Sequence, residues 1–232
     1  MQNLKHFIQD FSHLFFPHIC IGCGTDIIGQ AALLCFHCIN RLPVTNFNYE
    51  TGNQVEKLFY GRLPVIHAGS YCYFSKDSLV QRILHQLKYR GNKELGFFIG
   101  RMMGDWLMQS RRFDDIDALV PLPLYASREK RRGYNQAAIL CDGIASSIKI
   151  PVLSNAVTRV SATETQTHKN RIERWHNMEG RFRLQNSEAL KNKHVLLVDD
   201  VITTGATLEA CGQELIMAAN TQVSILTFAY TV

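Results

Sequence analysis

Four cysteines near the start of the chain have the spacing of a metal site. They form two Cys-x-x-Cys pairs separated by 11 residues: Cys20, Cys23, Cys35 and Cys38. Each pair can present two thiolates from a tight turn, and two such turns complete the tetrahedral shell that Zn²⁺ prefers. Two unrelated pairs of buried free cysteines would leave the spacing unexplained. We therefore predict a structural zinc site, for which His18 and His37 are alternative ligands.

A second candidate site is the segment 195–207, Val-Leu-Leu-Val-Asp-Asp-Val-Ile-Thr-Thr-Gly-Ala-Thr. Asp199 and Asp200 follow a predicted strand, and their carboxylates can accept hydrogen bonds from vicinal hydroxyls such as those of a ribose. The next residues bring threonine hydroxyls and backbone N–H groups to a helix start, where the helix dipole favours an anion. We predict a ribose-phosphate site whose phosphate loop is Thr203, Thr204, Gly205, Ala206 and Thr207. Because Gly-Lys-Ser/Thr does not occur, a Walker loop is excluded.

A basic cluster follows the predicted strand 118–120. Guanidinium groups bind phosphate oxygens in pairs, and a ligand of an open α/β sheet lies beyond the strand ends. We expect a loop that contacts phosphate, with a solvated basic loop as the alternative. The residues are Arg128, Lys130, Arg131 and Arg132.

A second basic segment, 163–182, has two interpretations. It carries the aromatic residues Trp175 and Phe182 among the basic residues Lys169, Arg171, Arg174 and Arg181. Basic groups with stackable rings suit single-stranded nucleic acid. The same residues could instead form a lid over the phosphate site, and both readings stay open.

The elements that must position these residues alternate between strands and helices. Continuous apolar strands separated by amphipathic helices are typical of a parallel sheet that is covered on both faces. We therefore predict an α/β fold with a doubly wound, mostly parallel sheet. The expected strands are 67–74, 118–120, 195–198 and 223–229, and the expected helices are 4–15, 79–87, 95–108, 134–148 and 206–219.

Length and composition set the broad class. The chain has 232 residues, 46% hydrophobic and 19% charged, which is typical of a globular protein, and a net charge of +5 identifies no partner. No stretch approaches the roughly 20 apolar residues of a membrane helix, and the start lacks the continuous apolar region of a secretory signal. An odd number of cysteines without that signal favours a reducing compartment. We expect a cytoplasmic protein with a zinc module, 1–45, and a larger domain, 55–232, joined by a polar linker, 46–53.

The chain resembles the ComF family, which is associated with competence and DNA uptake. The resemblance rests on the cysteine pairs, on 195–207, which is similar to the PRPP-binding motif of type I phosphoribosyltransferases (PRPP is 5-phosphoribosyl 1-diphosphate), and on shorter motifs. These motifs are Lys88-Tyr89-Arg90-Gly91, Pro121-Leu122-Pro123, Arg132-Gly133-Tyr134-Asn135-Gln136, Thr163-x-x-Gln166 and Arg174-x-x-Asn177.

The resemblance implies the fold of type I phosphoribosyltransferases and a role for each site. Asp199 and Asp200 would hold the ribose hydroxyls, Thr203 to Thr207 the 5′-phosphate, and the loop after Pro121 the pyrophosphate with Mg²⁺. The expected function is transfer of the phosphoribosyl group from PRPP, with release of pyrophosphate. The alternative is a non-catalytic module that senses PRPP or binds single-stranded DNA or a DNA-uptake protein. In the cytoplasm, a peripheral location at the inner membrane is the alternative to a free one. The sequence identifies neither the acceptor nor an acid or base.

Overall fold

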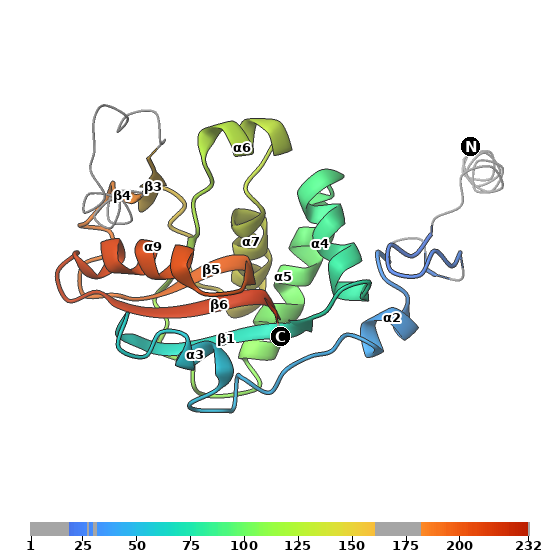
Figure 1. Ribbon diagram of the computed structural model, residues 1–232, viewed down its shortest axis with the longest axis horizontal. Coiled ribbons are helices and arrows are strands. Elements are labelled where there is room, and N and C mark those ends of the chain that lie inside the picture. The colour runs from blue at the N-terminus through green and yellow to red at the C-terminus, as the bar shows by residue number, and fades with distance from the viewer. Residues whose placement is uncertain (1–18, 27, 30–31, 161–181, 232) are drawn as a thin grey trace.

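The computed structural model describes residues 19–26, 28–29, 32–160 and 182–231 (Figure 1). The expected helix 4–15 lies outside these residues. So does most of the basic segment 163–182, including Lys169, Arg171 and Arg174.

A four-stranded parallel sheet forms the centre of the fold. Its strand order is β1-β6-β5-β2, and each neighbouring pair is parallel. The middle of each strand is buried and mostly apolar, because both faces of the sheet are covered, and the buried polar exceptions include Ser70 and Thr227. The strands are β1 (Val65–Phe74), β2 (Ala118–Pro121), β5 (His194–Ile202) and β6 (Gln222–Thr231). All four expected strands are confirmed. The prediction ended β5 before Asp199 and Asp200, whereas in the structure the strand includes both residues.

The helices agree with the sequence pattern except in the basic region. The longer ones are α4 (Leu79–Tyr89), α5 (Lys93–Leu107), α7 (Gln136–Ile148) and α9 (Ala206–Ile216), and the short ones are α2 (Phe36–Asn40), α3 (Gln54–Lys57) and α6 (Ala126–Arg132). No helix within the described residues is long and apolar enough to cross a membrane.

The connections place helices on both faces of the sheet. From β1 the chain crosses to β2 through α4 and α5, whereas from β5 it crosses in the opposite direction to β6 through α9. Since crossovers between parallel strands are right-handed, these connections lie on opposite faces. α7 shares the face of α5, because the two helices pack directly on each other. The sheet is therefore doubly wound, as predicted.

Glycines allow α5 and α7 to approach closely. A methyl group on Gly143 would lie 2.3 Å from the carbonyl oxygen of Phe97, and one on Gly100 would lie 2.3 Å from that of Leu140. These distances are far below a van der Waals contact, so a side chain at either position would push the helices apart. This contact holds α7, and with it the end of β2, in place.

A small second sheet was not expected from the sequence. β3 (Val157–Arg159) pairs in antiparallel fashion with β4 (Phe182–Leu184) and packs near α9. In Figure 1 it lies above α9. Strands of three residues carry too little periodicity to be recognised. Phe182, which we assigned to the basic segment, is a buried residue of β4.

The segment 46–53 is not a linker. The side chain of Asn48 donates to the carbonyl of Trp106 at 2.8 Å, and that of Asn53 donates to the carbonyl of Ala68 at 2.8 Å. Both asparagines and Phe47 are buried against β1 and α5. We predicted a linker because the segment is polar. In the structure the two amides instead donate hydrogen bonds to buried carbonyl groups of β1 and α5.

Candidate functional site

The candidate site lies where the strand connections diverge. β2 pairs in parallel with β5, and its next parallel contact, Leu119 with Val152, lies on its other side. From β2 the chain therefore turns outward in one direction, while from β5 it turns toward β6 in the other. Ligands of open α/β sheets bind beyond the carboxyl ends of strands at such a divergence. Because Pro121 is level with Val198, β5 extends beyond the end of β2 and carries the acidic pair into this crevice.

The two carboxylates of the pair have different surroundings. Asp200 is buried and forms an ion pair with Lys88 of α4, with 3.1 Å between Oδ2 and Nζ. Asp199 accepts a hydrogen bond from the backbone N–H of Asp200 at 2.8 Å. Burial and the neighbouring charge of Asp200 raise the pKa of Asp199, while that hydrogen bond, Lys88 and Arg159 lower it by less. Asp199 is therefore poised to exchange a proton or accept a compensating ligand.

The phosphate loop forms a small polar hollow of about 60 Å³ next to Asp199. Thr203 and Thr204 are exposed to solvent there, and α9 begins immediately after Gly205. Gly205 has a φ of 75°, which favours glycine. The structure thus brings the predicted loop residues and Asp199 together at the start of a helix, where backbone N–H groups are free to bind an anion.

Residues between α3 and β1 contact this loop, a feature that the sequence did not reveal. Arg62 donates to the carbonyl of Thr204 at 3.1 Å and forms an ion pair with Glu209 of α9. The ring of Phe59 lies against Gly205. These contacts join residues that are far apart in the sequence, so no local sequence pattern predicts them.

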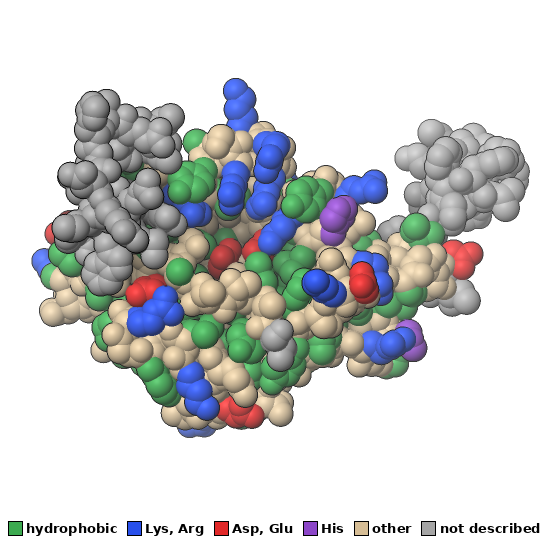
Figure 2. Space-filling view, in the orientation of Figure 1, with side chains coloured by type: hydrophobic (Ala, Val, Ile, Leu, Met, Phe, Trp, Pro, Cys, Tyr) green, Lys and Arg blue, Asp and Glu red, His purple; other side chains and the backbone are tan. Residues whose placement is uncertain are grey.

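The predicted basic loop is a helix, which corrects the sequence interpretation. α6 begins after the extended Tyr125 and ends at Gly133, whose φ of 80° terminates the helix. Lys130, Arg131 and Arg132 occupy the last turn, where they stabilise the negative end of the helix dipole. Arg128, Lys130 and Arg131 are exposed. Figure 2 shows Lys and Arg side chains gathered over α6 and the adjacent end of α4, above a hollow that contains acidic side chains.

The motif after α6 ties that helix to its surroundings. Tyr134 and Gln136 both donate to the carbonyl oxygen of Leu87 at the end of α4. Asn135 begins α7 by accepting from the N–H of Ala137, and its amide donates to the carbonyl of Leu122 at 3.0 Å. The motif therefore has a structural role, which is to hold α4, α6 and the end of β2 together.

Arg159 is a site residue that the sequence analysis missed. It ends β3, and its guanidinium carbon lies 4.0 Å from the ring centre of Tyr125 and 5.1 Å from that of Phe182. The charge is close enough to Asp199 to lower the pKa of that carboxyl. Arg159 also lines a hollow of about 310 Å³ beside Pro121 and Pro123. A single arginine in a short strand carries no recognisable signal.

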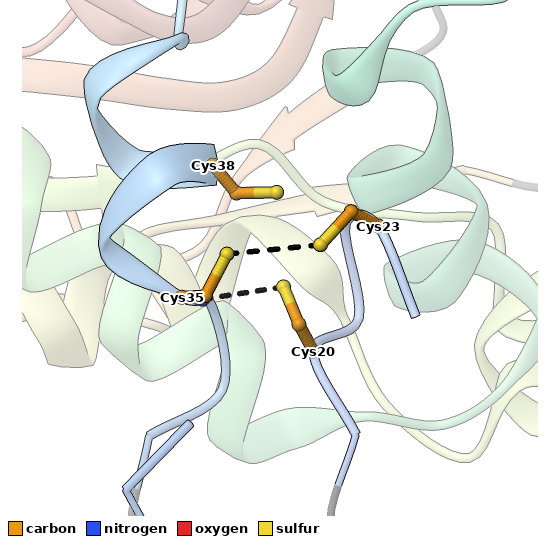
Figure 3. Close-up of side chains that lie close together, drawn as sticks. All are labelled: Cys20, Cys23, Cys35 and Cys38. Carbon is orange, nitrogen blue, oxygen red and sulfur yellow. Dashed lines mark hydrogen bonds between the residues drawn. The ribbon is translucent and has the colours of Figure 1, made fainter. Parts of the chain in front are cut away.

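The four cysteines converge as predicted (Figure 3). Their sulfur atoms all lie within 4.8 Å of one another, and those of Cys23 and Cys35 are 3.7 Å apart. Tetrahedral zinc with Zn–S bonds of about 2.3 Å separates its sulfurs by about 3.8 Å. The cluster could therefore bind zinc. His37 is exposed and contacts Arg41 instead of joining the cluster, and His18 lies outside the described residues.

Backbone groups favour a thiolate at Cys20, whereas burial and the neighbouring sulfurs raise the pKa of Cys38. The N–H of Cys35 donates to Sγ of Cys20 at 3.2 Å. Burial raises the pKa of Cys20, but this bond and those from Cys23 and Gly22 outweigh it and lower the pKa to about 6. A thiolate is the form that binds metal. The other described cysteines, Cys72, Cys141 and Cys211, are buried in strands and helices away from this cluster.

Comparisons with known proteins show which proteins the chain resembles. Residues 131–231 match the phosphoribosyl transferase domain family. The chain is 34% identical to the DNA utilization protein YhgH of Salmonella typhi over 146 aligned residues. The aligned residues make up 61% of this chain and 63% of that protein. The chain thus spans slightly less than two thirds of that relative.

Two further proteins are similar to the chain, but they differ in sequence identity and in the share of each chain that is covered. A glutamine PRPP amidotransferase from B. subtilis, solved with ADP and GMP, is 17% identical over 57% of this chain and 25% of its own, with a TM-score of 0.41, too distant to inform the site. Competence protein F of Haemophilus influenzae is 30% identical over 194 residues, which is 83% of this chain and 76% of that protein. Since this similarity spans most of both proteins and includes the phosphoribosyl transferase domain, the chain belongs to the ComF competence family.

Proposed function

We propose that this protein binds PRPP and transfers its phosphoribosyl group to an acceptor, with release of pyrophosphate. The observation that carries this proposal is the order of groups along one crevice. The phosphate loop contains Asp199 in its hollow. Asp200 pairs with Lys88 at the end of α4, and Tyr134, which follows the basic end of α6, donates to Leu87 beside Lys88. The order phosphate loop, acidic pair and basic end of α6 matches the 5′-phosphate, the ribose and the diphosphate of PRPP.

Each group has a distinct task in the proposed reaction. Asp199 and Asp200 accept hydrogen bonds from the ribose hydroxyls, and Thr203 to Thr207 bind the 5′-phosphate. The bond between ribose C1 and the diphosphate oxygen breaks, and its electron pair leaves with pyrophosphate. A nitrogen or other nucleophile of the acceptor then bonds to the cation-like C1, and its proton passes to the released pyrophosphate or to solvent. Positive groups near the diphosphate stabilise the charge that develops on it.

Metal ions have separate places in this proposal. Mg²⁺ is usually held by one or two carboxylates together with substrate phosphates, and the acidic pair beside the phosphate loop fits that donor set. Bound there, Mg²⁺ would neutralise the charge of the leaving diphosphate. The four cysteines would hold zinc as a structural ion, because a shell of four protein ligands leaves no position for substrate. We keep the division into a zinc module, 1–45, and a phosphoribosyltransferase-like domain, 55–232, in the cytoplasm.

The direct test is calorimetry with PRPP in the presence and absence of Mg²⁺, followed by a pyrophosphate-release assay over a panel of nucleobases and amines. We expect PRPP to bind with Mg²⁺ and one acceptor class to release pyrophosphate. Adenosine monophosphate serves as a control for general nucleotide-phosphate binding. A protein that does not bind PRPP at millimolar concentration would refute the proposal.

A second candidate function is binding of single-stranded DNA, with the PRPP site in a regulatory role. The exposed Arg128, Lys130 and Arg131 on α6 favour it, and the matched relatives are named for DNA utilization and competence. Replacing Arg171 and Arg174 of the basic segment together by alanine distinguishes the two functions. If these residues belong to a lid, the double variant should turn over PRPP more slowly. If they contact DNA, the slope of DNA affinity against salt concentration should become flatter by about one unit per lost contact, and PRPP binding should be unchanged.

A further inference from the structure

The segment between α3 and β1 contacts one face of α9 at three points. The contacting pairs are Phe59 with Gly205, Arg62 with Glu209, and Leu63 with Gly212. The three residues of α9 and its cap are spaced by four and then three positions, which places them on the same side of the helix. Phe59 and Leu63 are buried. Arg62 is therefore held against the first turn of α9 by an apolar contact on each side.

The guanidinium group of Arg62 has three partners. Nη1 donates to the carbonyl oxygens of Leu58 at 2.9 Å and Thr204 at 3.1 Å, while Nη2 forms the ion pair with Glu209. Because a guanidinium is planar and its donors form a rigid fork, these three bonds fix its orientation. Arg62 thus fixes the carbonyl of Thr204 relative to α9.

The bond to Thr204 determines which way the next peptide unit faces. In a trans unit the C=O and the N–H point in opposite directions, and no described peptide bond is cis. The N–H of Gly205 is therefore directed away from Arg62. This N–H has no hydrogen-bond partner among the described residues. Gly205 lines the phosphate hollow together with Asp199 and its neighbours in 201–208, whereas Arg62 lies outside that lining.

The backbone of Gly205 also defines the alternative orientation. Its φ of 75° and ψ of −4° are those of the third residue of a type II turn. A type I turn differs by about 150–170° in the two dihedral angles that flank the central peptide unit, which amounts to reversing that unit. Reversal would exchange the directions of the Gly205 N–H and the Thr204 carbonyl, and a carbonyl oxygen facing the hollow would repel an anion. The bond from Arg62 opposes this reversal.

Glu209 by itself would also oppose an anion at this loop. It lies in the first turn of α9, and its side chain is 19% exposed. A carboxylate in that turn competes with a phosphate for the positive end of the helix dipole. The ion pair with Arg62 compensates the charge of Glu209, so that the helix start remains favourable for a phosphate.

We propose that Arg62 is a positioning residue of the 5′-phosphate site, an inference that rests on the proposed function. Arg62 keeps the N–H of Gly205 directed into the hollow, where it donates to an oxygen of a sugar 5-phosphate, and it compensates Glu209. It acts through the loop and does not touch the ligand. Arg62 precedes the matched residues 131–231, so the phosphate loop depends on a residue outside the phosphoribosyl transferase domain match.

The first measurement is the affinity for PRPP and for ribose 5-phosphate, by calorimetry with Mg²⁺. The proteins are the parent, Arg62→Gln, Arg62→Lys and the control Lys57→Gln, which removes an exposed charge from α3. We expect Arg62→Gln to weaken both compounds about tenfold, because a charge-assisted bond that orients the phosphate donor is lost. The control should change neither. Arg62→Lys keeps the charge but lacks the fork, so it should restore part of the affinity, and it serves if Arg62→Gln unfolds.

Nuclear magnetic resonance reports the orientation of the peptide unit directly. Labelling threonine with ¹³C at the carbonyl and glycine with ¹⁵N selects Thr-Gly units. The sequence contains two of them, Thr51-Gly52 and Thr204-Gly205. The N–H of Gly52 already donates to the carboxylate of Glu56 at 2.6 Å and serves as the internal reference. Saturating ribose 5-phosphate should move the Gly205 amide proton downfield in the parent and much less in Arg62→Gln.

The outcomes separate this inference from the proposed function. If the parent and Arg62→Gln bind PRPP equally, the function stands and the positioning role is overturned. The role is also overturned if Arg62→Gln shows the full shift at saturation, or if adding Glu209→Gln to Arg62→Gln restores the parent affinity. A parent that binds ribose 5-phosphate with the Gly205 shift but does not bind PRPP keeps the positioning role and overturns the function. Binding of neither compound overturns both.

Discussion

The ring of Phe59 lies directly against Gly205, so that a methyl group added to the glycine would lie 3.1 Å from two ring carbons. Phe59 is fully buried, and Gly205 has a φ of 75° at the start of α9. The phosphate loop is therefore shaped by a residue far earlier in the chain. Its backbone cannot relax without moving a buried aromatic ring.

Gly205→Ala should therefore lower the free energy of unfolding by about 1–2 kcal/mol from the left-handed backbone alone, with an added cost for displacing Phe59. PRPP affinity should fall as well, because the loop shifts. Urea unfolding and calorimetry measure the two effects. Gly133→Ala is the matched control, since Gly133 has a φ of 80° but nothing within 4 Å of an added methyl. Equal losses of stability would show that contact with Phe59 contributes nothing.

Replacing either carboxylate of the acidic pair should weaken PRPP binding. A hydrogen bond from a ribose hydroxyl to a charged acceptor contributes roughly 1.5–3 kcal/mol, so Asp199→Asn and Asp200→Asn should each raise the dissociation constant about tenfold or more. Calorimetry on the folded variants tests this. The exposed Asp114, near the opposite ends of the strands, provides a control in Asp114→Asn. If both variants bind as tightly as the parent, the pair does not hold the ribose.

Asp199 should also make stability depend on pH. Burial and Asp200 raise its pKa to about 8, whereas an unfolded aspartate has a pKa of about 3.9. Between these values the folded state binds more protons, so the free energy of unfolding falls as pH rises through this window. Asp199→Asn keeps an acceptor for the N–H of Asp200 but does not ionise. Its free energy of unfolding should therefore not fall in this way as pH rises. At pH 9 it should be more stable than the parent by at least about 1 kcal/mol, equivalent to about one pKa unit.

Urea unfolding at pH 5, 7 and 9 measures this difference. Asp114→Asn controls for the removal of one negative charge. If the free energy of unfolding changes with pH in the same way for the parent and for Asp199→Asn, ionisation of Asp199 does not destabilise the folded protein. A variant that is more stable and yet does not bind PRPP would show that the carboxylate is kept for ligand binding at the expense of stability.

The purified protein should contain one zinc ion per chain. Structural zinc contributes on the order of 10 kcal/mol to folding of small modules, so Cys20→Ser or Cys38→Ser should remove the metal and destabilise the segment around it. Elemental analysis and limited proteolysis report these changes. The buried Cys72, Cys141 and Cys211 provide alanine controls that should keep the zinc. A metal-replete preparation without stoichiometric zinc would contradict the assignment.

Features that depend on neighbouring residues were predictable from the sequence. The strands, the longer helices, the convergence of Cys20 with Cys38 and the phosphate loop after Asp200 all follow from residue spacing over short distances. Burial on one face repeats with the period of the element, and turns depend on a few adjacent residues. For the same reason the order of groups along 195–207 already indicated a ribose-phosphate site.

Tertiary structure decided the rest. The pairing of Lys88 with Asp200, the support of Thr204 by Arg62 and the position of Arg159 beside the acidic pair join residues on different elements. Within the basic cluster, only the folded chain separates the half-buried Arg132 from its exposed neighbours. Such contacts depend on where the backbone carries each residue, and the close approach of α5 to α7 is one example of packing between distant elements. Local sequence sets the chemistry of each group, while packing between distant elements sets which groups act together.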